Sequence, residues 1–322
     1  MEKFSLSFLA ARFMCGGSAL TTGRNVSRKR LTLVNVIPDY PDIEAKLLSK
    51  EIEAYQKAKD LLRAVDKLTP EVLLDAHRCF FSNKFKLGRF RTTQNWIGKS
   101  LDTAEYVPPE PEKVKPEIEN WLGYLSHSAD SIELIIEAYT RLILLHPFPD
   151  ANGRLSRAFL DVMYSRIKND VVPLSLYRLG TNEKLYIKGV RAFGLDNSLG
   201  IKHPYWVDTI SWSENTTINA LEQIQKTKRA FQSQMGIFSI SKEEVQLMDY
   251  LWLYPITTHS HLQQTFNWDK EFCHSALQKL CNLRLLTTKK LKNSKHQVVF
   301  VCENVFTCFE AIDDLFLNKR SK

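Results

Sequence analysis

One stretch of the chain is more informative than any other: His146-Pro147-Phe148-Pro149-Asp150-Ala151-Asn152-Gly153-Arg154-Leu155-Ser156-Arg157. It begins with an imidazole at the end of an apolar run and turns at two prolines. A new helix is expected to begin at its Asn-Gly pair. Backbone N–H groups at such a turn and helix start point outward and attract anions. The stretch therefore predicts an anion-binding loop between two helices.

The side chains of the stretch add a chemical pattern. Arg154 and Arg157 are three residues apart, so they share one helical face and can each bind phosphate oxygens bidentately. Asp150 offers a hard oxygen ligand for Mg²⁺. His146 suits a general base, because its ordinary pKa lies near neutrality. A single histidine or arginine pair is usually structural, but the combination favours polyphosphate chemistry.

Helical spacing dominates the sequence around this stretch. Residues 132–146 are apolar on nearly every face, which indicates a central buried helix that ends before Pro147. The other expected helices cover residues 43–65 after Pro41-Asp42, a segment after Thr69-Pro70, about 111–126, a helix from within 152–154 through Met163, and segments of 181–230. Residues 84–109 contain glycine, several cations and Pro108-Pro109, which predicts an extended loop or short hairpin.

Residues 242–302 have a different rhythm. Helices at 243–253, 259–266 and 270–282, followed by strands at 285–290 and 297–302, are typical of a winged helix. Lysines 289, 290, 292 and 295 of the wing could contact DNA phosphates. Asp269 and Glu271 at the start of the candidate recognition helix oppose this, and residues 242–322 hold 11 Lys+Arg against 9 Asp+Glu. We rank protein interaction or dimerisation slightly ahead of DNA binding.

Composition sets wider limits. The 322 residues are 44% hydrophobic and 25% charged with a net charge of +8, as in a soluble globular protein that favours acidic partners. Six cysteines without a CxxC pair predict reduced thiols and no zinc ribbon. No apolar run approaches the roughly 20 residues that a membrane span needs. We expect a cytoplasmic protein with no membrane partner, divided into an N-terminal arm of loose order at 1–39, a catalytic domain at 40–235 and a winged-helix domain at 236–322.

The 146–157 stretch resembles the signature of the Fic (Fido) family, H-x-F-x-[DE]-G-N-G-R-x-x-R, and departs from it only at Ala151. The resemblance implies an all-α fold: a Fic-type helical core with a short β-hairpin flap, followed here by the small winged helix-turn-helix domain. It also implies transfer of AMP from ATP to Ser, Thr or Tyr hydroxyls of proteins, with the chain itself as one candidate target. Pyrophosphate is the leaving group, and Mg²⁺ bridges the phosphates.

By the same resemblance, each residue of the stretch has an expected role. His146 deprotonates the target hydroxyl, and Asp150 binds Mg²⁺. Asn152 and the backbone of Ala151, Asn152 and Gly153 form the anion hole, Arg154 binds the β-phosphate and Arg157 the γ-phosphate. Relatives that act as kinases carry Lys in place of Gly153, so this glycine favours nucleotidyl transfer. Ala151 is unfavourable by about 1 kcal/mol if the loop requires a positive φ there.

The resemblance extends over residues 40–215 through three weaker matches. The segment Arg91-Thr92-Thr93-Gln94-Asn95-Trp96-Ile97 resembles the family's flap, which binds the target backbone as an added strand. Ser49 and Glu53 resemble the inhibitory motif [ST]-x-x-x-E-[GN], with Ala54 as a departure, and imply an ion pair from Glu53 to Arg157. Asn182 and Tyr186 lie where relatives place adenine-pocket residues, although core packing explains Tyr186 equally well.

Two other functions stay open from the sequence. A DNA-binding regulator could use the nucleotide-bound core as a sensor and residues 242–302 to bind DNA. A hydrolase could use Glu53 to remove AMP from a modified protein. A homodimer is compatible with both, and the sequence names neither the target protein nor the preferred nucleotide.

Overall fold

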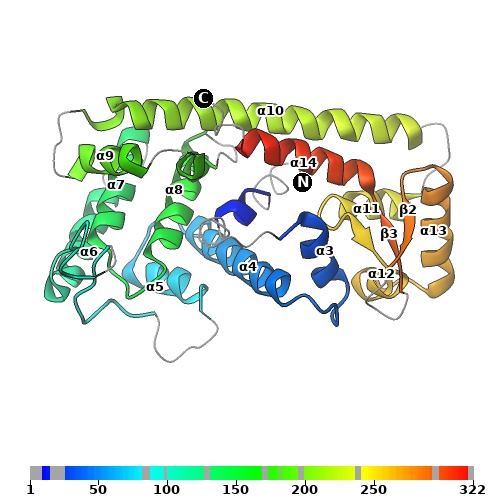
Figure 1. Ribbon diagram of the computed structural model, residues 1–322, viewed down its shortest axis with the longest axis horizontal. Helices are drawn as coiled ribbons and strands as arrows, with labels where there is room; N and C mark the ends of the chain where they lie inside the picture. Colours follow the sequence, from blue (N-terminus) through cyan, green and yellow to red (C-terminus); the bar gives the residue numbers. More distant parts are fainter. Residues whose placement is uncertain are drawn as a thin grey trace. The chain divides into compact units, whose positions relative to one another are not determined.

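The computed structural model describes residues 9–14, 26–81, 88–97, 100–126, 131–168, 173–180, 183–194, 199–235, 241–291 and 297–317. These residues are mainly helical, with one three-stranded sheet, so the all-α prediction is confirmed (Figure 1). Within them, no helix is both long and apolar enough to cross a membrane.

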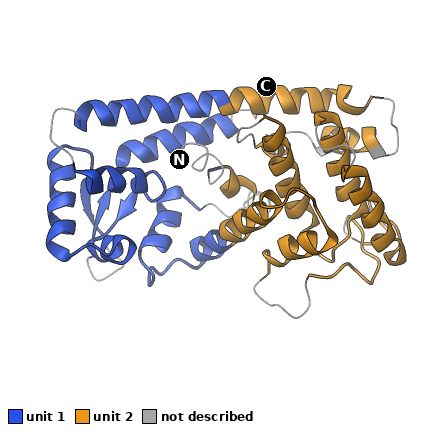
Figure 2. Ribbon diagram, turned by 180° about the vertical axis from the view of Figure 1, so that it is seen from behind, with its two compact units in different colours: residues 1–9, 16–50, 218–318 blue, residues 10–15, 51–217, 319–322 orange. Residues whose placement is uncertain are grey.

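The chain divides into two compact units (Figure 2). Unit 1 comprises residues 1–9, 16–50 and 218–318, and unit 2 comprises residues 10–15, 51–217 and 319–322. The divisions fall inside two helices, α4 (Ile43–Arg63) and α10 (Pro204–Met235). This differs from the predicted boundary at residue 236, which coincides with the end of α10 and not with the end of a unit.

Unit 2 contains the 146–157 loop between two central helices, α7 (Ile132–Leu145) and α8 (Asn152–Lys168), which pack against each other. Its remaining elements are the second part of α4, α5 (Pro70–Arg78), α6 (Pro111–Ser126), η1 (Leu174–Gly180), α9 (Glu183–Gly194), η2 (Gly200–Lys202) and the first part of α10. Most side chains of α7 are buried, as expected for a helix that is apolar on nearly every face.

Short polar residues begin the helices near the site. The Thr69 hydroxyl accepts a hydrogen bond from the Val72 N–H at 3.4 Å, and Pro70 follows at the first helical position. At α4, the Asp42 carboxylate accepts from the Ala45 N–H at 3.0 Å. These caps explain why both helices start where the sequence pattern predicts.

Unit 1 is built around an antiparallel sheet of order β1-β3-β2, with β1 at Ile256–Thr257, β2 at Thr287–Lys290 and β3 at Val298–Val301. In its register, Ile256 lies opposite Val301 and Thr288 opposite Phe300. Its helices are α3 (Arg28–Val36), the first part of α4, the second part of α10, α11 (Lys242–Leu251), α12 (His259–Phe266), α13 (Lys270–Asn282) and α14 (Glu303–Leu317). The sequence patterns predicted α11, α12, α13, β2 and β3, and missed β1 and α14.

The N-terminal segment corrects one prediction. Residues 1–39 were expected to form a loose arm, but residues 28–36 form α3 and pack into unit 1. Leu33, Val36 and Ile37 join the core of the sheet together with Ile256 and Val301. The basic Arg28 is buried and forms an ion pair with Asp313. A cation compensated in this way is compatible with a packed helix.

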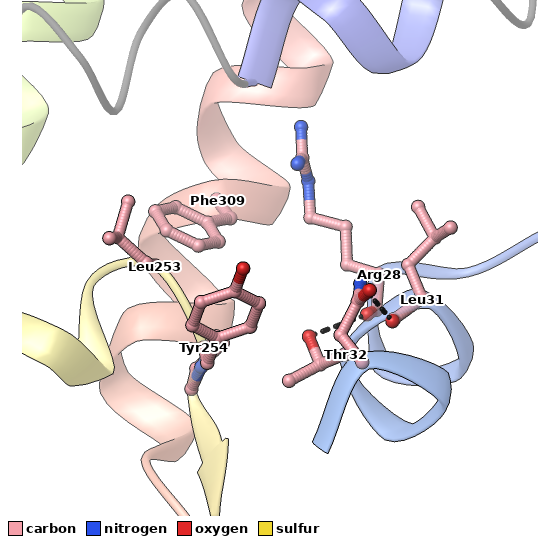
Figure 3. A pocket seen from close by; sticks show the side chains of 8 residues that line it. Arg28, Leu31, Thr32, Leu253, Tyr254 and Phe309 are labelled. Carbon is pink, nitrogen blue, oxygen red and sulfur yellow. Dashed lines mark hydrogen bonds between the residues drawn. The ribbon is translucent and has the colours of Figure 1, made fainter. Parts of the chain in front are cut away.

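A small cavity in unit 1 lies beside α3 (Figure 3). The rings of Tyr254 and Phe309 line it opposite Arg28 and Thr32. Its volume of about 20 Å³ leaves room for about one water molecule.

Candidate active site

The loop between α7 and α8 has an unusual backbone that its own side chains stabilise. His146 ends α7 in the left-handed region at φ 48°, and Ala151 adopts φ 60° just before α8. The buried Asn152 amide closes the turn, accepting from the Phe148 N–H at 2.9 Å and donating to the Phe148 carbonyl at 2.7 Å. The Asn152 side chain, which was predicted to help form an anion hole, is thus bonded to the loop itself.

The His146 imidazole has a defined proton arrangement. Its Nδ1 lies 3.2 Å from the Ile143 carbonyl oxygen, which can only accept, so Nδ1 carries the proton in the neutral ring. Burial lowers the pKa of His146 from its ordinary value and the nearby Arg91 cation acts in the same direction, while the hydrogen bond to Ile143 and the Asp150 charge act against them. The net lowering of the pKa favours a neutral ring, whose Nε2 is then unprotonated, and this is the form that a general base requires.

The cationic and acidic groups of the loop are more open. Asp150 has a carboxylate that is 67% exposed and lies 3.4 Å from the Arg154 guanidinium. That guanidinium also lies over the Phe80 and Phe81 rings. Arg157 extends toward the start of α8, because a Cβ placed on Gly153 would lie 3.0 Å from its Nη1. Both arginines thus lie at the beginning of α8, with Arg154 paired to Asp150.

Behind Arg157 lies a buried carboxylate that the sequence analysis missed. Asp161 is fully buried and accepts from the Ser175 N–H at 3.0 Å, from the Ser175 hydroxyl at 2.9 Å and from the Tyr55 hydroxyl at 3.4 Å. Burial raises the pKa of Asp161, while the charges of Lys59 and Arg157 act in the opposite direction. Asp161 lies four residues after Arg157, so the two side chains share one face of α8. This spacing is the signal in the sequence that could have indicated Asp161.

The flap has an inner and an outer side. Arg91 is buried, and its guanidinium donates to the carbonyls of His146 at 2.9 Å and of Pro109. Asn95 donates to the Phe148 carbonyl at 3.1 Å, and Gln94 to the Pro108 carbonyl at 2.9 Å. These three residues therefore connect the flap to the loop and to itself. The exposed residues of the flap, which form its outer side, are Thr92, Thr93, Trp96 and Ile97. Ile97 forms an antiparallel bridge to Tyr106.

A second missed residue is His77 on α5. It is fully buried, its Nε2 lies 3.0 Å from the Asp150 carbonyl oxygen, and its ring stacks on Phe148 at 3.9 Å. A histidine within an apolar helix is commonly a core residue, so the sequence offered no reason to select it.

The remaining predicted site residues have other contacts. Glu53 is exposed and pairs with Lys57 at 2.6 Å, and the part of the chain that the structure describes contains no ion pair between Glu53 and Arg157. The Ser49 hydroxyl donates to Asn35 at 2.8 Å within unit 1. Tyr186 is buried with its hydroxyl 3.1 Å from that of Tyr139, which agrees with the core-packing alternative. Asn182 lies outside the described residues.

In unit 1, two of the residues considered for DNA binding have partners within the protein. The Asp269 carboxylate caps α13 by accepting from the Phe272 N–H at 2.7 Å. Lys289 pairs with Glu303, while the other lysine of β2, Lys290, is exposed. Lysines 292 and 295 lie outside the described residues.

Comparison with known proteins agrees with this geometry. Residues 67–164 match the Fic/DOC family model. Protein adenylyltransferase fic-1 of Caenorhabditis elegans is 31% identical over 107 residues, which cover 31% of this chain and 20% of that protein. A uridine 5'-monophosphate transferase of Xanthomonas campestris pv. campestris is 39% identical over 83 residues, which cover 23% of this chain and 16% of that protein. The chain thus spans a fifth or less of the length of these two relatives.

Among solved structures, Fic-1 from C. elegans aligns with this chain with a TM-score of 0.48 and 22% identity over 69% of this chain and 64% of that one. A Fic domain-containing signalling protein from Bacteroides thetaiotaomicron has a TM-score of 0.49 and 14% identity over 68% of this chain and 88% of that one. The family match includes α5, the flap, α7, the whole 146–157 loop and most of α8. The similarity of this chain to the Fic/DOC family therefore extends over residues 67–164.

Proposed function

We propose that this chain transfers AMP from ATP to hydroxyl groups of proteins and releases pyrophosphate. The observation that carries the proposal is the proton arrangement of His146, whose Nδ1–H is bonded to the Ile143 carbonyl at 3.2 Å. Its Nε2 lone pair is therefore available beside a positive loop. The relatives named as an adenylyltransferase and a uridine monophosphate transferase support a nucleotidyl transfer of this kind.

The residues suggest how the reaction proceeds. Nε2 of His146 accepts the proton of a Ser, Thr or Tyr hydroxyl, whose oxygen attacks the α-phosphorus as the bond to the pyrophosphate oxygen breaks. Arg154 and Arg157 bind the β- and γ-phosphates and stabilise the charge that develops on the leaving group. The outer side of the flap, with Thr92 and Thr93, binds the target backbone as an added strand.

Mg²⁺ fits this site as a partner of the nucleotide and not as a resident of a protein cage. Asp150 supplies one exposed carboxylate, and no cluster of three or more acidic, histidine or cysteine ligands occurs within the described residues. One carboxylate plus phosphate oxygens is a usual arrangement for Mg²⁺. When bound, the ion supplies positive charge to the phosphates, and Asp150 is the residue that would bind it.

Labelling tests the proposal directly. The purified chain is incubated with ATP or UTP labelled at the α-phosphate, together with candidate protein targets, and the modified products are analysed by mass spectrometry. AMP on a protein hydroxyl is the expected result, and UMP would show that the nucleotide is assigned wrongly. Absence of any nucleotide on protein, with wild-type and Glu53-substituted chains, would reject the function.

The role of Glu53 is a separate part of the proposal. Its place on α4, which contacts α8 through Tyr55 and Asp161, supports an inhibitory role, whereas its ion pair with Lys57 does not contribute to one. Under inhibition, Glu53→Ala increases labelling, and alanine avoids the helix destabilisation of about 1 kcal/mol that glycine causes. Release of AMP from a modified protein that disappears in Glu53→Ala would instead identify a hydrolase.

A further inference from the structure

His77 contacts the loop at the Asp150–Ala151 peptide. Its Nε2 lies 3.0 Å from the carbonyl oxygen of Asp150, the residue before Ala151. A carbonyl oxygen only accepts, so Nε2 carries the proton and Nδ1 does not. Nδ1 is buried and has no hydrogen-bond partner within the described residues. The ring stacks on Phe148 with an angle of 10° between planes, so it is fixed from two directions.

Ala151 provides the reason that this contact matters. Its φ of 60° lies in the left-handed region, which costs an L-residue other than glycine about 1–2 kcal/mol. A flip of the Asp150–Ala151 peptide would rotate this φ by roughly 180° to about −120°, outside the left-handed region. The flip would therefore remove the left-handed φ at Ala151.

The flip would change the charge of the loop. The carbonyl and the N–H of one peptide point in opposite directions, so the bond to His77 directs the Ala151 N–H away from α5. In the flipped peptide, the Asp150 carbonyl oxygen would take the place of that N–H. A carbonyl oxygen facing phosphate is repulsive, whereas an N–H is attractive.

We propose that His77 is a positioning residue of the phosphate-binding loop. Its Nε2–H holds the Asp150 carbonyl, and thereby fixes the orientation of the Ala151 N–H, which donates to the Asp150 carboxylate in this structure and which a nucleotide phosphate would have to take over. This inference rests on the proposed function for the identity of the ligand, and on the geometry alone for the orientation of the peptide. It assigns to α5 a direct effect on the site at α8.

Four variants of the full chain separate the hydrogen bond from the packing. His77→Phe keeps an aromatic ring on Phe148 and removes the donor. His77→Gln places an amide nitrogen near the position of Nε2, whereas His77→Asn reaches only the position of Nδ1, and both lose the stacking equally. Ala151→Gly removes the strain, because glycine adopts positive φ readily.

Calorimetry measures the Kd for ATP·Mg²⁺ and for inorganic tripolyphosphate, without turnover. We expect His77→Phe and His77→Asn to weaken both about tenfold, as the loss of one hydrogen bond to a fixed group predicts, and His77→Gln to stay within about threefold of wild type. In the Ala151→Gly background, the loss caused by His77→Phe should shrink to about twofold. Equal losses in both backgrounds would show that His77 acts only through packing, and would overturn the inference.

A crystal structure of His77→Phe without nucleotide gives a second readout. The expected result is a flipped Asp150–Ala151 peptide with negative φ at Ala151, and an unchanged peptide contradicts the proposal. The outcomes also separate the inference from the proposed function. A wild-type chain that binds ATP and transfers nothing, with binding weakened in His77→Phe, rejects the function and retains the positioning role. Transfer of AMP by the wild-type chain, with ATP binding unchanged in His77→Phe, retains the function and rejects the positioning role.

Discussion

The 146–157 loop in unit 2 and the β2–β3 hairpin in unit 1 both stand out in the sequence by their cations, but their surroundings differ. Buried or half-buried side chains distant in sequence donate to carbonyls of the loop: Arg91 to His146 O, Asn95 to Phe148 O and His77 to Asp150 O. On the hairpin, the lysines of β2 are exposed, and Lys289 pairs with Glu303 at the surface.

This difference shows which charged side chains restrict the conformation of the chain. Burying a polar group is unfavourable unless hydrogen bonds compensate it, so buried donors at the loop restrict it to few conformations. An exposed lysine keeps its solvation in many arrangements and restricts little. The loop should therefore respond strongly to single substitutions, and the hairpin weakly.

The largest effect is expected at His146. His146→Ala removes the proton acceptor and should lower the rate of nucleotide transfer about 10²- to 10⁴-fold, while the Kd for ATP changes little. Lys289→Ala on the hairpin is the matched control and should leave the rate unchanged. Quantitative labelling over time gives both rates, and a His146→Ala chain with more than about a tenth of the wild-type rate would contradict the assignment of the base.

The next effect is on stability at Arg91. Arg91→Met leaves the carbonyls of His146 and Pro109 without their donor, and should lower the free energy of unfolding by about 3 kcal/mol. Thr93→Ala, on the outer side of the same flap, should change it by less than about 0.5 kcal/mol. Urea unfolding measures both, and similar values for the two variants would mean that the flap is not held by its inner side.

The pH dependence of transfer sharpens the role of the His146 environment. The neutral ring is active, and burial places its pKa below the ordinary 6.5, so activity persists below pH 6.5 before it falls. Further acidification should then reduce the rate about tenfold per pH unit. A pH–rate profile at saturating ATP tests this, and an acid midpoint above 6.5 would show that the ring is not desolvated during turnover.

A smaller gain is expected at Ala151. The left-handed conformation costs alanine about 1–2 kcal/mol, and glycine recovers this less an entropic cost of about 0.5–1 kcal/mol, so Ala151→Gly should raise stability by about 0.5–1 kcal/mol. Arg284→Gly in unit 1, at φ 57°, should give a similar gain. Thermal unfolding compares the two, and a loss of stability in Ala151→Gly would show that neighbouring contacts already compensate the strain.

The smallest effect is expected on the hairpin. Glu303→Gln removes the surface ion pairs to Lys289 and Lys29, and should cost less than about 0.5 kcal/mol, with no effect remaining at 1 M salt. Arg28→Met, which breaks the buried pair with Asp313, should cost several times more. Chemical unfolding at two salt concentrations compares the stability of the two variants. A large, salt-independent loss of stability in Glu303→Gln would contradict the difference between the buried and the surface ion pair.

Prediction from the sequence succeeded where one residue type implies one local structure. Pro147 ends α7, Thr69-Pro70 begins α5, and the 146–157 signature locates the loop. It failed where a residue depends on distant partners. The basic residue Arg28 suggested a loose arm, whereas in the structure its charge is compensated by Asp313. Nothing near His77 in the sequence indicates that its side chain contacts Asp150. The motif at Ser49 and Glu53 predicted a contact that side-chain exposure does not support.

The space beside Gly153 has a consequence for how such a site can change through mutation. A side chain at this position meets the Arg157 guanidinium, which a Cβ would approach to 3.0 Å. The effect of a substitution at 153 thus depends on the residue at 157, and the two positions are epistatic. A side chain at 153 displaces the end of the flexible Arg157 side chain by a few tenths of an ångström. The cost of a substitution at 153 is therefore set by how freely the residue at 157 can move.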